Sequence, residues 1–95
     1  MGKYKLSNVA KEDLIRIHHY GVKQFGIKQA DKYFDSFFVH FELIAKNPQS
    51  FESVDFIKPG YRRCVCGVDS IFYKINGDGV DIMAIFGRQD LNQLL

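Results

Sequence analysis

Residues 61–90 read YRRCVCGVDSIFYKINGDGVDIMAIFGRQD, and this stretch decides the fold because three strand-like runs follow one another across two tight-turn signals. The three runs are Tyr61–Cys66, Ser70–Ile75 and Val80–Phe86. Gly67-Val68-Asp69 joins the first two, and Asn76-Gly77-Asp78-Gly79 is a stronger hairpin signal between the second and third. The third run is apolar apart from one aspartate, so we expect it to be the central strand of an antiparallel sheet.

An α-helix and a short strand are predicted at the start of the chain. Lys3–Leu6 (KYKL) reads as a strand, and Ser7 or Asn8 then offers an N-cap for a helix over residues 8–25. The apolar positions of this helix recur at helical spacing and are expected to face the core: Ala10, Leu14, Ile17, Gly21 and Phe25. Gly26 is a suitable stop at its C-terminal end.

A second helix begins at once at Ile27, so the two helices should form an antiparallel hairpin. It ends at Asn47-Pro48, because proline disfavours helical geometry in the residue before it. One arc of its helical wheel is apolar and is the expected core face: Ala30, Tyr33, Phe34, Phe37, Phe38, Phe41, Ile44 and Ala45. Val39 and Leu43 lie on the other side among charged residues, and they are either incidental or part of a contact with a partner.

The predicted order is therefore β-α-α-β-β-β, an α+β fold with a helical hairpin packed on a small antiparallel sheet. A loop over residues 49–59, anchored by Phe51, Phe56 and Ile57, joins the helices to the three strands. With 95 residues, 46% hydrophobic and 15% aromatic, the composition fits a single globular domain over residues 1–95. The formal net charge of +2 is mild and does not by itself indicate nucleic-acid binding.

The cysteines and the N-terminus favour a cytoplasmic protein. No apolar segment of a signal peptide follows the first five residues, and no run approaches the length that a membrane span needs. Cys64 and Cys66 are two apart in a strand, where their side chains share one face at a spacing poorly suited to a disulfide. We expect both to be reduced.

The sequence predicts neither a metal site nor a cofactor. His18 and His19 are consecutive in a helix and project about 100° apart, so they cannot bind one metal together, and His40 lies on the other helix. The chain also lacks a nucleophile elbow, a P-loop and a dinucleotide-binding glycine pattern.

The arginines are the candidate binding groups. Arg62 and Arg63 are adjacent on a strand and should point to opposite faces, one bracing the loop and the other reaching a partner. Arg88 follows the third strand with Asp90 two residues on; it serves either as an anion-binding fork or as one half of a clamp that holds the C-terminus.

A catalytic role finds little support on these strands. A ribonuclease would need a general acid and base beside the arginines, and only Tyr61 and Tyr73 carry protons there. The pKa of an unassisted phenol is about 10, too high for a general base at neutral pH. We therefore expect the chain to bind its target without catalysis and class it as a non-enzyme.

The whole chain resembles the ParE branch of the ParE/RelE toxin superfamily. The resemblance is carried by the short strand and helical hairpin, then PGYRR, DSIFYKI and VDIMAIFGRQD, which ends in R-x-D. It implies a toxin of a type II toxin-antitoxin system that inhibits DNA gyrase, through its A subunit, by binding, and that a ParD-like antitoxin neutralises. No cofactor, membrane contact or sequence-specific nucleic-acid binding is implied.

The resemblance also supplies the candidate contact residues. For the gyrase target they are Arg62, Arg63, Arg88, Asp90, Tyr61 and Tyr73. For the antitoxin, whose helix and strand should cover the hairpin and a sheet edge, they are Val39, Leu43, Arg16 and Tyr20.

Two alternatives to gyrase inhibition follow from the same resemblance. The RelE branch cleaves mRNA on the ribosome, and Arg62, Arg63 or Arg88 would then contact the scissile phosphate. Against this reading, Ser70 stands where that branch typically has a basic residue, and the C-terminus, LNQLL, has no His or Tyr. The other alternative is an inactive domain that only binds its antitoxin.

Overall fold

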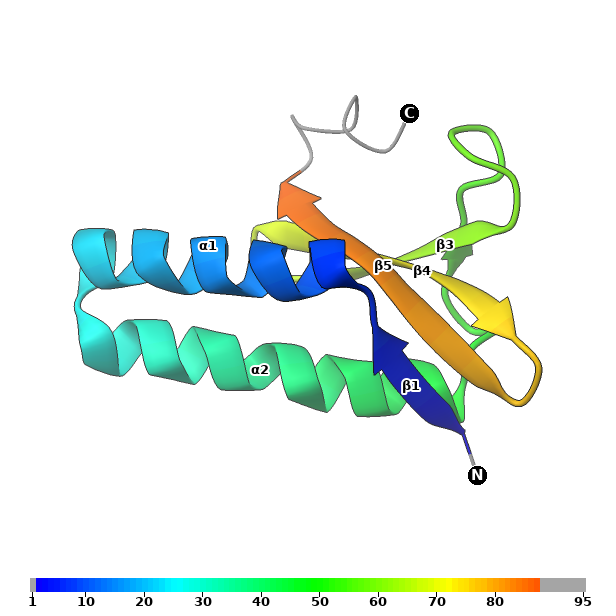
Figure 1. Cartoon of the computed structure of the whole chain (residues 1–95), viewed down its shortest axis with the longest axis horizontal. Coiled ribbons are helices and arrows are strands. Elements are labelled where there is room, and N and C mark those ends of the chain that lie inside the picture. Colours follow the sequence, from blue (N-terminus) through cyan, green and yellow to red (C-terminus); the bar gives the residue numbers. More distant parts are fainter. Residues whose placement is uncertain (1, 88–95) are drawn as a thin grey trace.

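The chain folds as an α-helical hairpin on one face of a five-stranded sheet, as a computed structural model of residues 2–87 shows (Figure 1). The elements in order are β1 (Lys3–Leu6), α1 (Asn8–Phe25), α2 (Ile27–Lys46), β2 (Glu52–Ser53), β3 (Tyr61–Cys66), β4 (Asp69–Asn76) and β5 (Gly79–Gly87). The predicted fold class and order are confirmed, with the short β2 as an added strand. Within the described residues, neither helix is long and apolar enough to cross a membrane.

The helix ends form as their sequence predicts. The Ser7 side chain caps α1 by accepting a hydrogen bond from the Ala10 amide at 3.0 Å. Gly26 then takes φ = 90°, a conformation that favours glycine, and reverses the chain between the helices. Gly21 lets the helices approach closely, because a Cβ at this position would lie 3.2 Å from the Cβ of Ala30.

The strand order is β1-β5-β4-β3-β2, and the sheet is mixed. β3, β4 and β5 pair antiparallel as expected, but β1 pairs parallel to β5, so the sheet is not wholly antiparallel. The central strand of the sheet is β4, whereas the sequence predicted that Val80–Phe86, in β5, would be central. This apolar run is nevertheless internal, since β5 has a strand on each side.

Each face of the sheet has its own apolar cluster. The helix-covered face includes Cys64, Cys66 and Tyr73, which pack with Phe37 and Phe41 of α2. Both cysteines are free thiols, and they lie on one face as predicted. The opposite face holds a smaller cluster: Val54, Tyr61, Phe72, Ala84 and Phe86, with Ile57 and Met83 packed against it.

Two predicted core residues are exposed instead. Phe25 has 69% of its surface exposed because it ends α1 at the turn of the hairpin, which projects past the sheet (Figure 1). Phe56 is 79% exposed. Val54 is the buried anchor of that loop, and its amide donates to the Tyr61 carbonyl at 2.8 Å, extending the pairing of β2 with β3.

Candidate functional site

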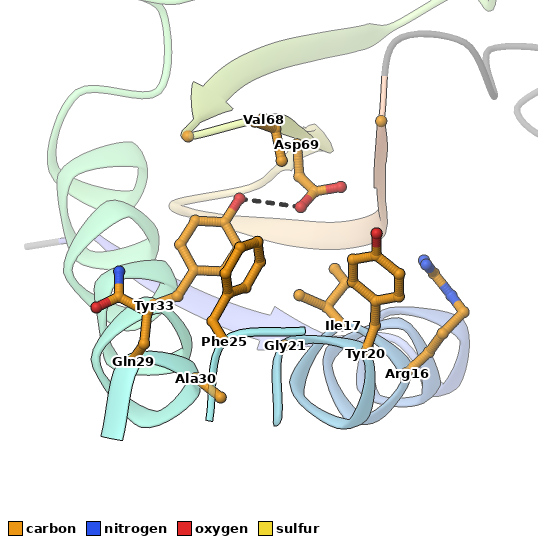
Figure 2. Close-up of a pocket in the computed structure, with 12 residues that line it drawn as sticks. Arg16, Ile17, Tyr20, Gly21, Phe25, Gln29, Ala30, Tyr33, Val68 and Asp69 are labelled. Atoms are coloured by element: carbon orange, nitrogen blue, oxygen red, sulfur yellow. Dashed lines mark hydrogen bonds between the residues drawn. The ribbon is translucent and has the colours of Figure 1, made fainter. Parts of the chain in front are cut away.

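A groove of about 610 Å³ lies between the projecting end of the helical hairpin and the turn that joins β3 to β4 (Figure 2). Its wall on the helix side is largely aromatic, because Tyr20, Phe25 and Tyr33 extend from the helices toward the turn. Exposure is high along this wall, at 61% for Tyr20 and 69% for Phe25. On the opposite wall, Val68 is 83% exposed. The groove therefore offers apolar surface that the rest of the described chain leaves uncovered.

One end of the groove is closed by a hydrogen-bonded bridge from Tyr33. Its hydroxyl lies 2.8 Å from the Cys66 carbonyl and 2.9 Å from a carboxylate oxygen of Asp69, so it ties α2 to the turn. Burial, and then the hydrogen bond to Asp69, raise the pKa of Tyr33 well above its usual value. The phenol therefore stays protonated and acts as a structural donor.

Gly67 makes this bridge possible. It takes φ = 61°, and a Cβ there would lie 2.5 Å from a ring carbon of Tyr33. Only glycine fits both the left-handed backbone and the contact with the ring.

Arg16 marks the other side of the groove, where α1 meets the end of β5 (Figure 2). β1 pairs only with the first part of β5, Gly79–Ile82. Farther along β5, side chains of α1 form hydrogen bonds with the backbone of this strand. Arg16 donates to the Ile85 carbonyl at 3.0 Å, and Asp13 accepts from the Ile85 amide at 2.9 Å. An ion pair of 3.3 Å joins Arg16 and Asp13, and the exposed guanidinium retains donors for a partner.

The predicted antitoxin contacts fall on two surfaces. Arg16 and Tyr20 both line the groove. Val39 and Leu43 are exposed on α2, as predicted, but they do not line it. The structure thus brings two of the four residues together and leaves the other two as a separate patch.

The arginines of β3 are already engaged within the chain. Arg62 donates to the Phe51 carbonyl at 2.7 Å and so braces the loop after α2. Arg63, on the opposite face of β3, pairs with Glu52 of β2 at 2.7 Å. Arg88 and Asp90 lie outside the described residues.

Tyr73 and Tyr61 require a correction as candidate contact residues, since both are buried. Tyr73 is 0% exposed and donates to the Pro48 carbonyl at 2.6 Å. Burial raises the pKa of Tyr73 to about 12. Tyr61 belongs to the core of the opposite face, with the Lys58 ammonium 5.5 Å from its ring centre. Neither ring presents a surface for a partner.

The thiols and histidines in the described residues do not form a reactive centre. Burial raises the pKa of Cys64 to about 11, and burial also raises the pKa of Cys66, so both thiols stay protonated at neutral pH. His18 pairs with Asp31 at 2.7 Å between the two helices. Over residues 2–87, no group of three or more His, Cys, Asp or Glu side chains is placed to hold a metal ion.

Sequence reasoning predicted only Arg16 and Tyr20 among the groove residues, and those it missed include Phe25, Tyr33, Val68 and Asp69. Helical periodicity assigned Phe25 and Tyr33 to the core, and Val68 and Asp69 were read only as a turn. The available signal was the aromatic residue immediately before Gly26. An apolar residue at the tip of a hairpin has no sheet to pack against when the helices are longer than the strands.

Comparison with known proteins gives one consistent result. The family model for the ParE toxin of the type II toxin-antitoxin system parDE matches residues 4–91. Toxin ParE1 of Caulobacter vibrioides is 34% identical over 92 residues, which cover 97% of this chain and 94% of that protein. Toxin ParE1 of Mycobacterium tuberculosis is 30% identical over 95 residues, covering 98% and 97%.

A solved structure is also similar. A chain of the chromosomal ParDE toxin-antitoxin system from P. aeruginosa matches with a TM-score of 0.80 at 19% identity, covering 92% of this chain and 96% of that one. At this identity the likeness shows the fold alone, and it supports the arrangement of helices and sheet described above.

Proposed function

Because the chain belongs to the family of ParE toxins of type II toxin-antitoxin systems, we propose that it inhibits DNA gyrase by binding its A subunit. It acts in the cytoplasm, blocks replication and catalyses no reaction of its own. A ParD-like antitoxin holds it inactive by covering part of its surface.

The groove is the proposed antitoxin site, and the exposed aromatic wall is the observation that carries this assignment. An amphipathic helix binds by placing apolar side chains, spaced along one face, into a complementary apolar groove. Tyr20, Phe25 and Val68 provide such a surface, and each is more than half exposed in the free toxin. Arg16 at the groove side offers a charge-assisted contact for a carboxylate of the antitoxin.

The patch of Val39 and Leu43 is a second proposed contact for the antitoxin. These residues lie i and i+4 on α2, so they form one small apolar surface beside polar neighbours. An antitoxin segment that wraps the hairpin after filling the groove would reach them.

The gyrase contact is proposed for the arginines of β3 and the exit of β5. The Arg63 side chain is only 17% exposed in its pair with Glu52, which is 51% exposed, so a gyrase contact through Arg63 would replace that pair. Arg88 and Asp90 are the other proposed gyrase contacts. Arg62 holds the loop after α2 through its hydrogen bond to the Phe51 carbonyl. Support for binding rather than chemistry comes from Tyr73, which is buried and has a raised pKa.

A supercoiling assay tests the proposal directly. Purified toxin, freed of antitoxin, should inhibit gyrase at micromolar concentration, and Arg88→Ala should remove inhibition while antitoxin binding persists. Intact supercoiling at that concentration refutes gyrase inhibition. Ribosome-dependent cleavage of mRNA in a translation extract would assign the toxin to the RelE type of activity.

A further inference from the structure

A row of charged side chains crosses the sheet on the face away from the helices. The strand register places Lys5 of β1, Asp81 of β5, Lys74 of β4 and Tyr61 of β3 side by side. Side chains alternate along a strand, so Lys3 shares this face with Lys5. We call Lys3, Lys5 and Lys74 the lysine band.

The side chains of the lysine band are exposed and make no ion pair with the described residues. Among residues 2–87, the side chains that pair with a carboxylate are Arg16, His18 and Arg63, and none is a lysine. Asp81 stands within the row, but its carboxylate accepts a hydrogen bond from the Asn76 side chain at 3.1 Å. A shallow hollow of about 260 Å³ is lined by Lys5 and Lys74 and also by Asp81, whose carboxylate offsets part of the positive charge there.

The charge pattern of α2 differs from that of the band. α2 carries three lysines, Lys28, Lys32 and Lys46, interleaved with three acidic residues, Asp31, Asp35 and Glu42. The charges on α2 are balanced, whereas the row across the sheet, together with Lys3 beside it, holds the three lysines of the band and one carboxylate, that of Asp81. A polyanion would therefore meet a local excess of positive charge on the sheet and none on α2.

From this arrangement we propose that the lysine band binds the phosphate backbone of duplex DNA without reading its sequence. Lysine contacts phosphate as a mobile point charge, and phosphate contacts position a protein without specifying bases. Lys5 and Lys74 are separated by two strand spacings, about 10 Å, so they can engage different phosphates. The proposal does not rest on gyrase inhibition, since it concerns the toxin and DNA alone.

The salt dependence of binding gives a quantitative test. With three phosphate contacts, a plot of the logarithm of the binding constant against the logarithm of the salt concentration should have a slope of about −2.7. Fluorescence anisotropy of a labelled duplex should then show affinity falling about 40-fold between about 50 and about 200 mM salt. The double variant Lys5→Gln/Lys74→Gln loses two of the three phosphate contacts, so its affinity should fall only about fourfold over the same salt range.

A matched control separates the lysine band from net charge. Lys23→Gln/Lys32→Gln removes the same charge from exposed positions of α1 and α2 and should leave the salt slope unchanged. Equal losses in both double variants would overturn the proposal, as would the lack of any salt-dependent binding by the wild type. Thermal unfolding should be the same for the wild type and both double variants, which checks that each protein is folded.

Removing the negative charge of Asp81 tests the proposal in the opposite direction, because DNA binding should then become tighter. Asp81→Asn removes the carboxylate within the row and should tighten DNA binding severalfold, whereas Asp35→Asn on α2 should not. Equal tightening by both would indicate a response to net charge alone and overturn the site. Tighter binding of polyglutamate than of the duplex, at the same salt, would reassign the surface to an acidic polypeptide and refute the DNA proposal.

Discussion

Replacing Phe25 by alanine is expected to weaken the proposed toxin-antitoxin complex with little effect on the free toxin. Full burial of a Phe side chain contributes about 1.5–3 kcal/mol. Since 69% of Phe25 is exposed in the free toxin, covering it in the groove would contribute about 1–2 kcal/mol. This corresponds to a Kd raised by about 5- to 30-fold in the variant.

Phe56→Ala provides the matched control for this measurement. Phe56 is the same residue type and is 79% exposed, but it lies in the loop before β3 and does not line the groove. Isothermal titration of each purified toxin with its cognate antitoxin would give the two affinities, and thermal unfolding would check that both variants fold. Equal effects of the two substitutions, or an unchanged Kd for Phe25→Ala, would refute the assignment of the groove.

Further predictions concern stability and the second apolar patch. Gly67→Ala should destabilise the fold by more than Gly77→Ala, because both glycines have positive φ but only Gly67 touches the Tyr33 ring; the excess in urea unfolding should be about 1–3 kcal/mol. The raised pKa of Tyr73 means that the unfolded chain loses this proton first, so its contribution to stability is present below pH 10 and falls by about 1.4 kcal/mol per pH unit up to about pH 12. Tyr73→Phe should make the slope of that part of the alkaline profile shallower by about 1.4 kcal/mol per pH unit, and an unchanged slope would contradict the assignment. Leu43→Asp should weaken antitoxin binding in the same titration, and an unchanged Kd would remove the α2 patch from the interface.

Local signals were sufficient to predict the helices and the three consecutive strands. Ser7 caps α1 and Gly26 ends it at the predicted positions, because a cap is a contact between neighbours in sequence. The partner of β1 could not be predicted in this way. KYKL holds four residues and no register signal, and its parallel pairing to β5 joins segments separated by both helices.

The groove was predictable only in part. Arg16 and Tyr20 were predicted as antitoxin contacts from the family resemblance, and both line the groove. Periodicity alone misplaced Phe25, because it reports which residues share a helix face and not how far the sheet extends beneath that face. The exposure of Phe25 depends on the length of the hairpin relative to the strands, which is a property of the assembled fold.

The proposed antitoxin and DNA surfaces should act independently, because they use different parts of the structure. The groove lies between the helices and the β3–β4 turn, whereas the lysine band occupies the sheet face away from the helices. Changes at separate sites without shared partners usually add in free energy to within about 0.3–0.5 kcal/mol. Phe25→Ala should therefore leave DNA affinity unchanged, and Lys5→Gln/Lys74→Gln should leave antitoxin affinity unchanged. A larger coupling in the combined variant would show that the two surfaces share a conformational change, and antitoxin binding would then control the contact with DNA.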